Sequence, residues 1–194
     1  MKKVFFLIAS ICLATNALAQ QKISWEAQAG IGSTSLSSDA GSLVQPKIGF
    51  QLGVRATKDI PSIAQGVYGN AGAFIASKGA TFDIGIVKAD ITAYYLEIPV
   101  HLGYKKAVNE QFTLFGEAGP YLGYGIVGKA HSQTISFNGG MITDNEDVFK
   151  TKDRITYGLG LRCGAEFKQK YTASVGYAFS KDINSLTLTI GYKF

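Results

Sequence analysis

The last ten residues, Ser185-Leu-Thr-Leu-Thr-Ile-Gly-Tyr-Lys-Phe194, decide the fold class of this chain. Apolar side chains occupy every second position, and small or polar residues lie between them. Successive side chains of a β-strand point to opposite faces, so this segment would form a strand with one apolar face and one polar face. No amphipathic helix of useful length is predicted after the N-terminal segment, and the remaining chain is expected to assemble as further strands.

Seven other segments, most of them about ten residues long, are also strand-like and are separated by polar or glycine-rich breaks. They are Ile23–Ser33, Lys47–Ala56, Tyr68–Ser77, Ile91–Tyr104, Phe112–Val127, Ile155–Phe167 and Tyr171–Ser180. The total of eight predicts an all-β fold, namely an eight-stranded antiparallel up-and-down transmembrane β-barrel with both termini at one end. The pattern of Tyr68–Ser77 leaves open which of its two faces is apolar.

The connections between these strands form two sets. One set holds Thr34–Pro46, Lys78–Asp90, Gly128–Arg154 and Lys181–Asn184, and the other holds Thr57–Val67, Lys105–Gln111 and Lys168–Lys170. Barrels of this type have longer extracellular loops and shorter periplasmic turns, so we expect the first set outside the cell and the second in the periplasm. Gly128–Arg154 is the longest connection, and loops of that length are usually functional or disordered.

Alternation alone does not decide whether the apolar face points outward into lipid or inward, as in a soluble lipocalin-like ligand-binding barrel. The aromatic residues favour the outward arrangement, because they fall near the strand ends and would form the two girdles of a membrane barrel. The predicted inner girdle is Trp25, Tyr104, Phe112, Phe167, Tyr171, Tyr192 and Phe194, and the outer girdle is Tyr94, Tyr124, Tyr157, Tyr177 and Phe179. Pro99 and Pro120 lie within predicted strands, where we expect bulges or locally broken pairing.

The segment Met1–Ala19 has the features of a cleaved secretory signal peptide. Lys2-Lys3 begins it, an apolar run follows, and Ala17-Leu18-Ala19 supplies the cleavage site. Residues 20–194 are then expected to form the barrel domain. Cys163 becomes the only cysteine, so no internal disulfide is expected. No Lys/Arg run interleaved with aromatic residues occurs, so nucleic-acid binding has little support.

The final strand, which ends on an aromatic residue, resembles the C-terminal insertion signal of bacterial outer-membrane barrels. Three short stretches resemble the PorT-type outer-membrane β-barrel family of Bacteroidota, and the resemblance extends over essentially the whole mature chain. They are Ser77-Lys78-Gly79, Tyr95-Leu96-Glu97-Ile98-Pro99 and Gly116-Glu117-Ala118-Gly119-Pro120-Tyr121-Leu122-Gly123. The resemblance implies an eight-stranded outer-membrane barrel with prolines at these two places. It implies no catalytic residues; the founding member is tied to the secretion of surface proteins.

The polar face of the strands carries charged residues that would meet inside the barrel. We predict a structural network of ion pairs and hydrogen bonds there, because buried charges must be paired. Its expected members are Glu26, Lys47, Arg55, Glu97, His101, Glu117, Arg162, Glu166 and Lys193. His101 and Glu97 invite a catalytic interpretation, but four residues along a strand separate them by about 13 Å.

Two other groups of residues invite a chemical interpretation. Asp144-Asn145-Glu146-Asp147 lacks the alternating ligand spacing of a calcium loop. His131 and Ser132 begin the long loop, but no spacing fixes the geometry of an enzymatic site. We therefore expect no metal, no cofactor and no enzyme.

The sequence predicts a monomeric barrel embedded in outer-membrane lipid. Its expected role is structural, or lies in contacts of the extracellular loops with secretion machinery or surface proteins. A narrow channel for small or apolar solutes is the main alternative, and the soluble ligand-binding barrel is the other.

Overall fold

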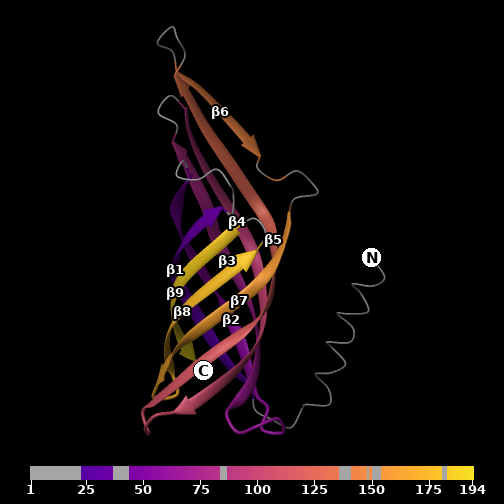
Figure 1. Cartoon of the computed structure of the whole chain (residues 1–194), viewed down its shortest axis with the longest axis vertical. Helices are drawn as coiled ribbons and strands as arrows, with labels where there is room; N and C mark the ends of the chain where they lie inside the picture. The colour runs from indigo at the N-terminus through magenta and orange to yellow at the C-terminus, as the bar shows by residue number, and fades with distance from the viewer. Residues whose placement is uncertain are drawn as a thin grey trace, which may run out of the picture.

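The computed structural model describes residues 23–36, 44–83, 87–135, 141–147, 149, 154–180 and 183–194. The predicted signal peptide Met1–Ala19 lies outside the described residues. Across the described ranges the chain forms β-strands, and no helix there is long and apolar enough to cross a membrane. Figure 1 shows these strands wound into a tilted barrel.

The sheet contains nine strands in the described part of the chain. They are β1 (Ser24–Leu36), β2 (Val44–Asp59), β3 (Val67–Asp83), β4 (Val87–Ala107), β5 (Phe112–Ile135), β6 (Met141–Asp147), β7 (Ile155–Phe167), β8 (Tyr171–Ser180) and β9 (Ile183–Lys193). Every pair is antiparallel, and the spatial order is β4-β3-β2-β1-β9-β8-β7-β5-β6, with β4 also paired to β5. The β4–β5 pairing closes a ring of eight strands, whereas β6 pairs with β5 outside that ring. The predicted eight-stranded antiparallel barrel is confirmed.

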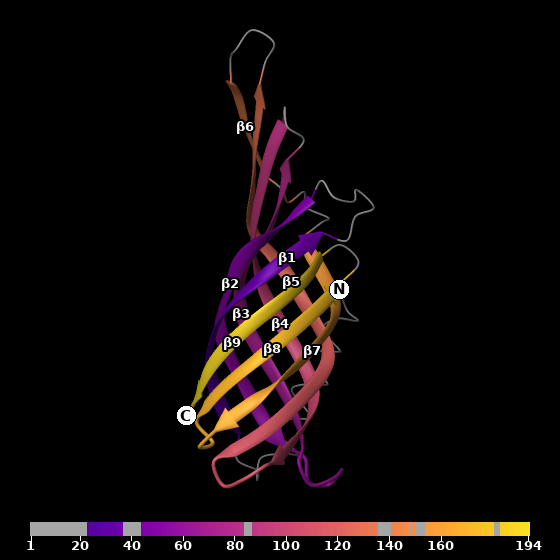
Figure 2. The ribbon, with the colours of Figure 1, turned by 60° about the vertical axis from the view of Figure 1, so that its left-hand side comes forward.

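One end of the barrel carries an extension that the sequence did not predict. β4 and β5 are 21 and 24 residues long, whereas β8 and β9 are 10 and 11. The long strands therefore project beyond the ring, and β6 lies along the projecting part of β5 (Figures 1 and 2). Large parts of the predicted loops Lys78–Asp90 and Gly128–Arg154 are strands. The apolar–polar alternation marks a strand only where one face meets lipid, and these projecting strands lie beyond that zone.

The apolar faces of the strands point outward. Leu52, Leu96, Leu102, Leu161 and Leu188 are all exposed, as are the other large apolar residues of the outward positions. The lumen side is buried and mostly polar. A lipocalin-like barrel would show the reverse arrangement, so the structure contradicts that alternative. Residues at the inward positions of β3 include Tyr68 and Phe74, while Ile75 faces outward, which answers the question left open for Tyr68–Ser77.

Both strand prolines lie where pairing is interrupted, as predicted. The β3–β4 register runs from Ala71 opposite Val100 directly to Phe74 opposite Glu97, which leaves Pro99 without a β3 partner. The β4–β5 register runs from Pro99 opposite Tyr121 directly to Leu102 opposite Ala118, which leaves Pro120 without a β4 partner. A bulge that was not predicted lies nearer the outer end, at Ile126 of β5, which is the extra residue opposite Tyr94 and Tyr95 of β4. It makes the two consecutive residues after Gly125 of β5 both point outward. Such a bulge inserts one extra residue into a strand and shifts its alternation.

Candidate functional site

The lumen is crossed near its middle by a cluster of charged side chains around Glu117 of β5. One carboxylate oxygen, Oε1, accepts hydrogen bonds from Arg55 Nη1 at 2.8 Å and Arg162 Nη1 at 3.2 Å. His101 Nδ1 lies 3.2 Å from the same oxygen. The four residues come from β2, β4, β5 and β7, so the cluster joins strands from different parts of the barrel wall. The Glu117 side chain is only 1% exposed, and the three cationic or ring nitrogens take the place of water.

Two residues of β3 complete this cluster. Tyr68 donates its hydroxyl hydrogen to Glu117 Oε2 at 2.9 Å, and Asn70 Nδ2 donates to the same oxygen at 2.8 Å. Asn70 Oδ1 also accepts from Arg55 Nη1 at 2.5 Å. Neither Tyr68 nor Asn70 was among the predicted lumen residues, because the inward face of β3 could not be chosen from its sequence. We refer to the six residues Arg55, Tyr68, Asn70, His101, Glu117 and Arg162 as the Glu117 cluster.

The remaining predicted lumen residues lie above or below the Glu117 cluster. Glu97 pairs with Lys78 Nζ at 2.5 Å on the extracellular side, and no hydrogen bond joins Glu97 to His101 in the described structure. On the periplasmic side, Glu26 accepts from Thr172 and lies 3.8 Å from Arg162 Nη2. The carboxylate of Glu166, also on that side, pairs with Lys193.

Lys47 belongs to neither group. It lies at the outer end of β2, about a quarter of its side chain is exposed, and it pairs with Asp90 and donates to Thr92. The sequence predicts it on the lumen face but could not show that it lies above the other charges. Its partner Asp90 belongs to the part of β4 that the sequence assigned to a loop.

Aromatic side chains lie at the extracellular end of the lumen. The rings of Tyr95 and Phe149 meet edge to face with their centroids 5.5 Å apart, and both side chains are buried. Phe149 follows β6 in the chain, and its ring lies at the barrel mouth. Beneath the pair, the Lys78 ammonium lies 5.4 Å from the ring centroid of Tyr121. These contacts add apolar and cation–π packing above the charged layer.

A small polar cavity of about 70 Å³ lies beside the Glu117 cluster. Buried side-chain atoms of Gln28, Arg55, His101 and Arg162, which line this cavity, lack a hydrogen-bond partner in the described structure. A second cavity of about 20 Å³ lies on the periplasmic side of the cluster. Polar cavities of this size suit a few ordered water molecules, which would satisfy those atoms. Side chains of the Glu117 cluster separate the two spaces.

The chemistry open to the lumen is limited. Glu117 accepts from five side chains, so its lone pairs are engaged and it is poorly placed to act as a general base. Ser174, the nearest hydroxyl to Arg162, accepts from Arg162 Nε at 2.8 Å and bonds Thr189. No group of acidic, histidine or cysteine residues within the described part of the chain could hold a metal ion. The side chains of His131, Ser132 and Asp144–Asp147 lie outside those that the structure describes.

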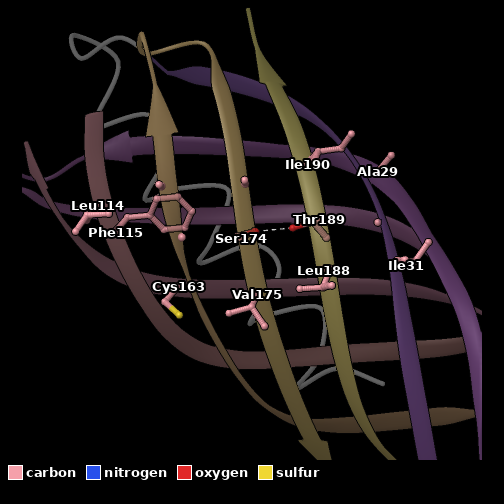
Figure 3. A pocket seen from close by; sticks show the side chains of 14 residues that line it. Ala29, Ile31, Leu114, Phe115, Cys163, Ser174, Val175, Leu188, Thr189 and Ile190 are labelled. Atoms are coloured by element: carbon pink, nitrogen blue, oxygen red, sulfur yellow. Dashed lines mark hydrogen bonds between the residues drawn. The ribbon is translucent and has the colours of Figure 1, made fainter. Parts of the chain in front are cut away.

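The outer wall has a broad apolar hollow over β1, β9, β8, β7 and the inner end of β5 (Figure 3). Small residues form part of its lining, and larger apolar side chains surround them. The residues labelled in Figure 3 are Ala29, Ile31, Leu114, Phe115, Cys163, Ser174, Val175, Leu188, Thr189 and Ile190. Cys163 faces this hollow and carries a free thiol. The lining matches the hydrocarbon region of a bilayer, and its two hydroxyl side chains, Ser174 and Thr189, are buried and bond each other.

Rings flank this apolar zone. At the inner end, the centroids of Phe112 and Phe167 lie 5.0 Å apart, and those of Tyr171 and Tyr192 lie 5.6 Å apart. Rings in this position sit at the level of the lipid headgroups.

Comparison with known proteins agrees with this architecture. Residues 18–186 match the family described as outer membrane protein beta-barrel domain. No curated protein sequence matches the chain significantly. Similar solved structures include neisserial surface protein A (NspA), with 14% identity over 88% of this chain and 95% of that one, at a TM-score of 0.49. The attachment invasion locus protein Ail of Yersinia pestis has 17% sequence identity over 89% of this chain and 99% of its own, at a TM-score of 0.48. OprG of Pseudomonas aeruginosa has 13% sequence identity over 90% of this chain and 97% of its own, at a TM-score of 0.48.

These structural likenesses are too distant to carry an argument about activity. The family match, in contrast, extends over most of the chain, and the barrel has the outward apolar face that a membrane requires. The chain belongs to the outer membrane protein β-barrel domain family, and it is a protein of the outer membrane.

Proposed function

We propose that this protein is a closed, monomeric, non-catalytic barrel that acts through its extracellular extension, as a surface-interaction or protein-secretion accessory component. The observation that carries the proposal is the unequal length of the strands. β4 and β5 continue beyond the ring and, with β6, form a projecting sheet. Anchoring alone would need only strands long enough to cross the bilayer, about 9–11 residues.

The filled lumen supports a role outside the barrel rather than through it. The Glu117 cluster, formed from five strands, occupies the middle of the lumen, and aromatic residues lie above it. We infer that this polar network is structural, since each charge has a partner that holds the wall together. Breaking such a buried arrangement is costly.

The resemblance to PorT-type barrels of Bacteroidota makes secretion the more specific form of the proposal. Two of the stretches that carry it, Tyr95–Pro99 and Gly116–Gly123, pair with each other across β4 and β5. They supply Glu97, Glu117 and Tyr121 to the lumen. The resemblance therefore falls on one structural unit at the base of the extension, which supports a shared role for the extension and its base.

The test is quantitative proteomics of surface-exposed and secreted proteins in a deletion strain. We expect selective loss of a set of exported proteins, restored by the wild-type gene. A variant in which a two-residue turn replaces residues 130–146 should reach the membrane normally but fail to restore export. The matched control replaces Asn109-Glu110 in a periplasmic turn with Gly-Ser and should restore export fully. An unchanged exported set in the deletion strain would contradict the secretion role.

The narrow channel is the competing function, and the two cavities stacked along the lumen are the observation that favours it. Purified barrel in a planar bilayer distinguishes the two. We expect no steady conductance from the wild-type protein, because charged side chains fill the space between the cavities. Discrete, reproducible conductance steps from the wild-type barrel would replace the proposed function with transport.

A further inference from the structure

Three exposed lysines at the periplasmic end differ from four lysines of the barrel that pair with carboxylates in the described structure. Lys47, Lys78, Lys105 and Lys193 each pair with a carboxylate. Lys106, Lys168 and Lys170, by contrast, are exposed and have no carboxylate partner among the described side chains. We call these three residues the inner lysine cluster. An unpaired cation is usual on a water-exposed surface, but these three lie at the edge of the membrane zone.

Their position relative to the inner aromatic girdle places them at the depth of lipid headgroups. Lys106 follows Tyr104 by two residues, on the same outward face of β4, which corresponds to about 7 Å along the strand. Lys168 directly follows Phe167, and its ammonium lies 5.2 Å from the centroid of that ring. Lys170 directly precedes the girdle residue Tyr171. Aromatic girdles mark the membrane–water interface, so charges just beyond them meet phosphate groups.

The three lysines also share one sector of the barrel. The turn of residues 168–170 lies against the β4–β5 turn, since the Lys168 amide donates to the Gln111 carbonyl at 2.7 Å. Lys106 is opposite Leu114 of β5, one strand away from β7. Glu110, in the β4–β5 turn, is the exposed carboxylate of this sector. Three positive charges against one negative charge leave the sector positive.

The backbone of the β7–β8 turn supplies an independent observation. Lys168 and Gln169 have φ values of 51° and 57°, in the left-handed region. Two-residue hairpin turns of this kind favour Asn and Gly, which adopt that conformation at lower free energy. This turn therefore holds a lysine at a backbone cost, and the result is an ammonium over Phe167 on the lipid side of the wall.

We propose that the inner lysine cluster binds the phosphate headgroups of anionic phospholipids in the periplasmic leaflet. Lysine is a compact point charge that suits phosphate, and its long stem can run along apolar surface while the ammonium reaches the interface. Each lysine near an anionic membrane surface strengthens binding by about fivefold, and salt weakens the attraction. The inference concerns how the barrel is held in its leaflet and does not depend on the role of the extracellular extension.

The experiment measures which lipids contact the folded barrel. The mature chain is folded into phosphatidylcholine bilayers that contain a trace of spin-labelled phosphatidylglycerol or spin-labelled phosphatidylcholine, and the motionally restricted fraction gives their relative association. We expect phosphatidylglycerol to associate at least about twofold more strongly at low salt, because only one sector of the lipid shell touches the lysines. The preference should disappear near 1 M NaCl, where the Debye length is about 3 Å.

The variant K106Q/K168Q/K170Q should lose the preference at low salt while folding normally, since these side chains are exposed. Lys47→Gln, which removes a lysine paired at the opposite end of the barrel, is the matched control and should retain the preference. Equal association of the two lipids with the wild-type barrel would overturn the proposal. A preference that survives in the triple variant would overturn it as well, and would assign the selectivity to other residues.

Discussion

The two faces of the barrel wall are made by the same strands but must satisfy different requirements. On the lumen face, Glu117 has five hydrogen-bonding partners, and each must occupy a defined position. On the lipid face, Leu188 is 58% exposed and Ile190 is 70% exposed, and they meet acyl chains that have no fixed positions. The lumen therefore requires particular residues, whereas the lipid face requires only that its residues be apolar.

The largest effect should come from Glu117→Ala. The change leaves Arg55 and Arg162 buried without their shared carboxylate, which typically costs about 3–5 kcal/mol for a buried ion pair broken on one side. The measurement is urea unfolding of the barrel in lipid vesicles, followed by the fluorescence of Trp25, the only tryptophan. The matched control Glu110→Ala removes an exposed carboxylate of the β4–β5 turn and should change the free energy of unfolding by about 0.5 kcal/mol or less. Equal small effects of both variants would show that the lumen charges are not coupled.

The same contrast explains what the sequence could predict. Where one face meets lipid, alternation is enforced, and the outward residues of β9, such as Leu186, Leu188 and Ile190, follow directly from the pattern. Tyr68 and Phe74 break the rule, because they are aromatic residues that point into the lumen. Phe74 occupies space that the absent side chains of neighbouring glycines leave open, and this fit depends on strand register.

Alternation could assign the charged residues of the candidate site to the lumen, but it could not assign Tyr68 and Asn70, and it could not predict the contacts. Arg55, Glu117 and Arg162 all occupy inward-facing positions of their strands, so alternation places them in the lumen. Only the register between the strands brings them to the same height along the barrel axis. Strand residues beyond the membrane have no face in contact with lipid, so their sequence need not alternate between apolar and polar residues. The strand β6 and the outer parts of β4 and β5 could therefore not be recognised. The bulge at Ile126 of β5 likewise depends on the pairing of two strands rather than on either sequence alone.

A charge on the lipid face tests the opposite side of the comparison. Leu188 lies at the middle of β9, and Leu188→Arg should cost about 2–4 kcal/mol, the range for a basic residue near the bilayer midplane. Leu188→Ile keeps the apolar surface and should cost about 0.5 kcal/mol or less. Both are measured by the unfolding assay in vesicles. A cost for Leu188→Arg as small as that for Leu188→Ile would mean that this position does not face hydrocarbon.

Gln28→Met tests whether the lumen cavity contains water. Gln28 is 3% exposed, and neither of its amide atoms has a partner in the described structure. If water fills the cavity of about 70 Å³, methionine loses those hydrogen bonds, and we expect a destabilisation of about 1–2 kcal/mol. In a dry cavity the same substitution would stabilise the barrel, because it would remove an unsatisfied amide. Gln111→Met, at an exposed turn position, controls for the change of side-chain type.

The smallest change in stability is expected from labelling or replacing Cys163, so this residue can report on the lipid face with little disturbance of the fold. Cys163 is exposed on the outward face of β7 and is the only cysteine after the predicted signal peptide. A charged, membrane-impermeant maleimide cannot enter hydrocarbon, so the folded barrel in vesicles should resist labelling and become reactive on unfolding. Asn109→Cys in a Cys163→Ser background places the thiol in an exposed turn and should react in the folded state. Equal reaction rates of the two folded proteins would place Cys163 in water, and the distinction between a lipid face and a lumen face would fail at that strand.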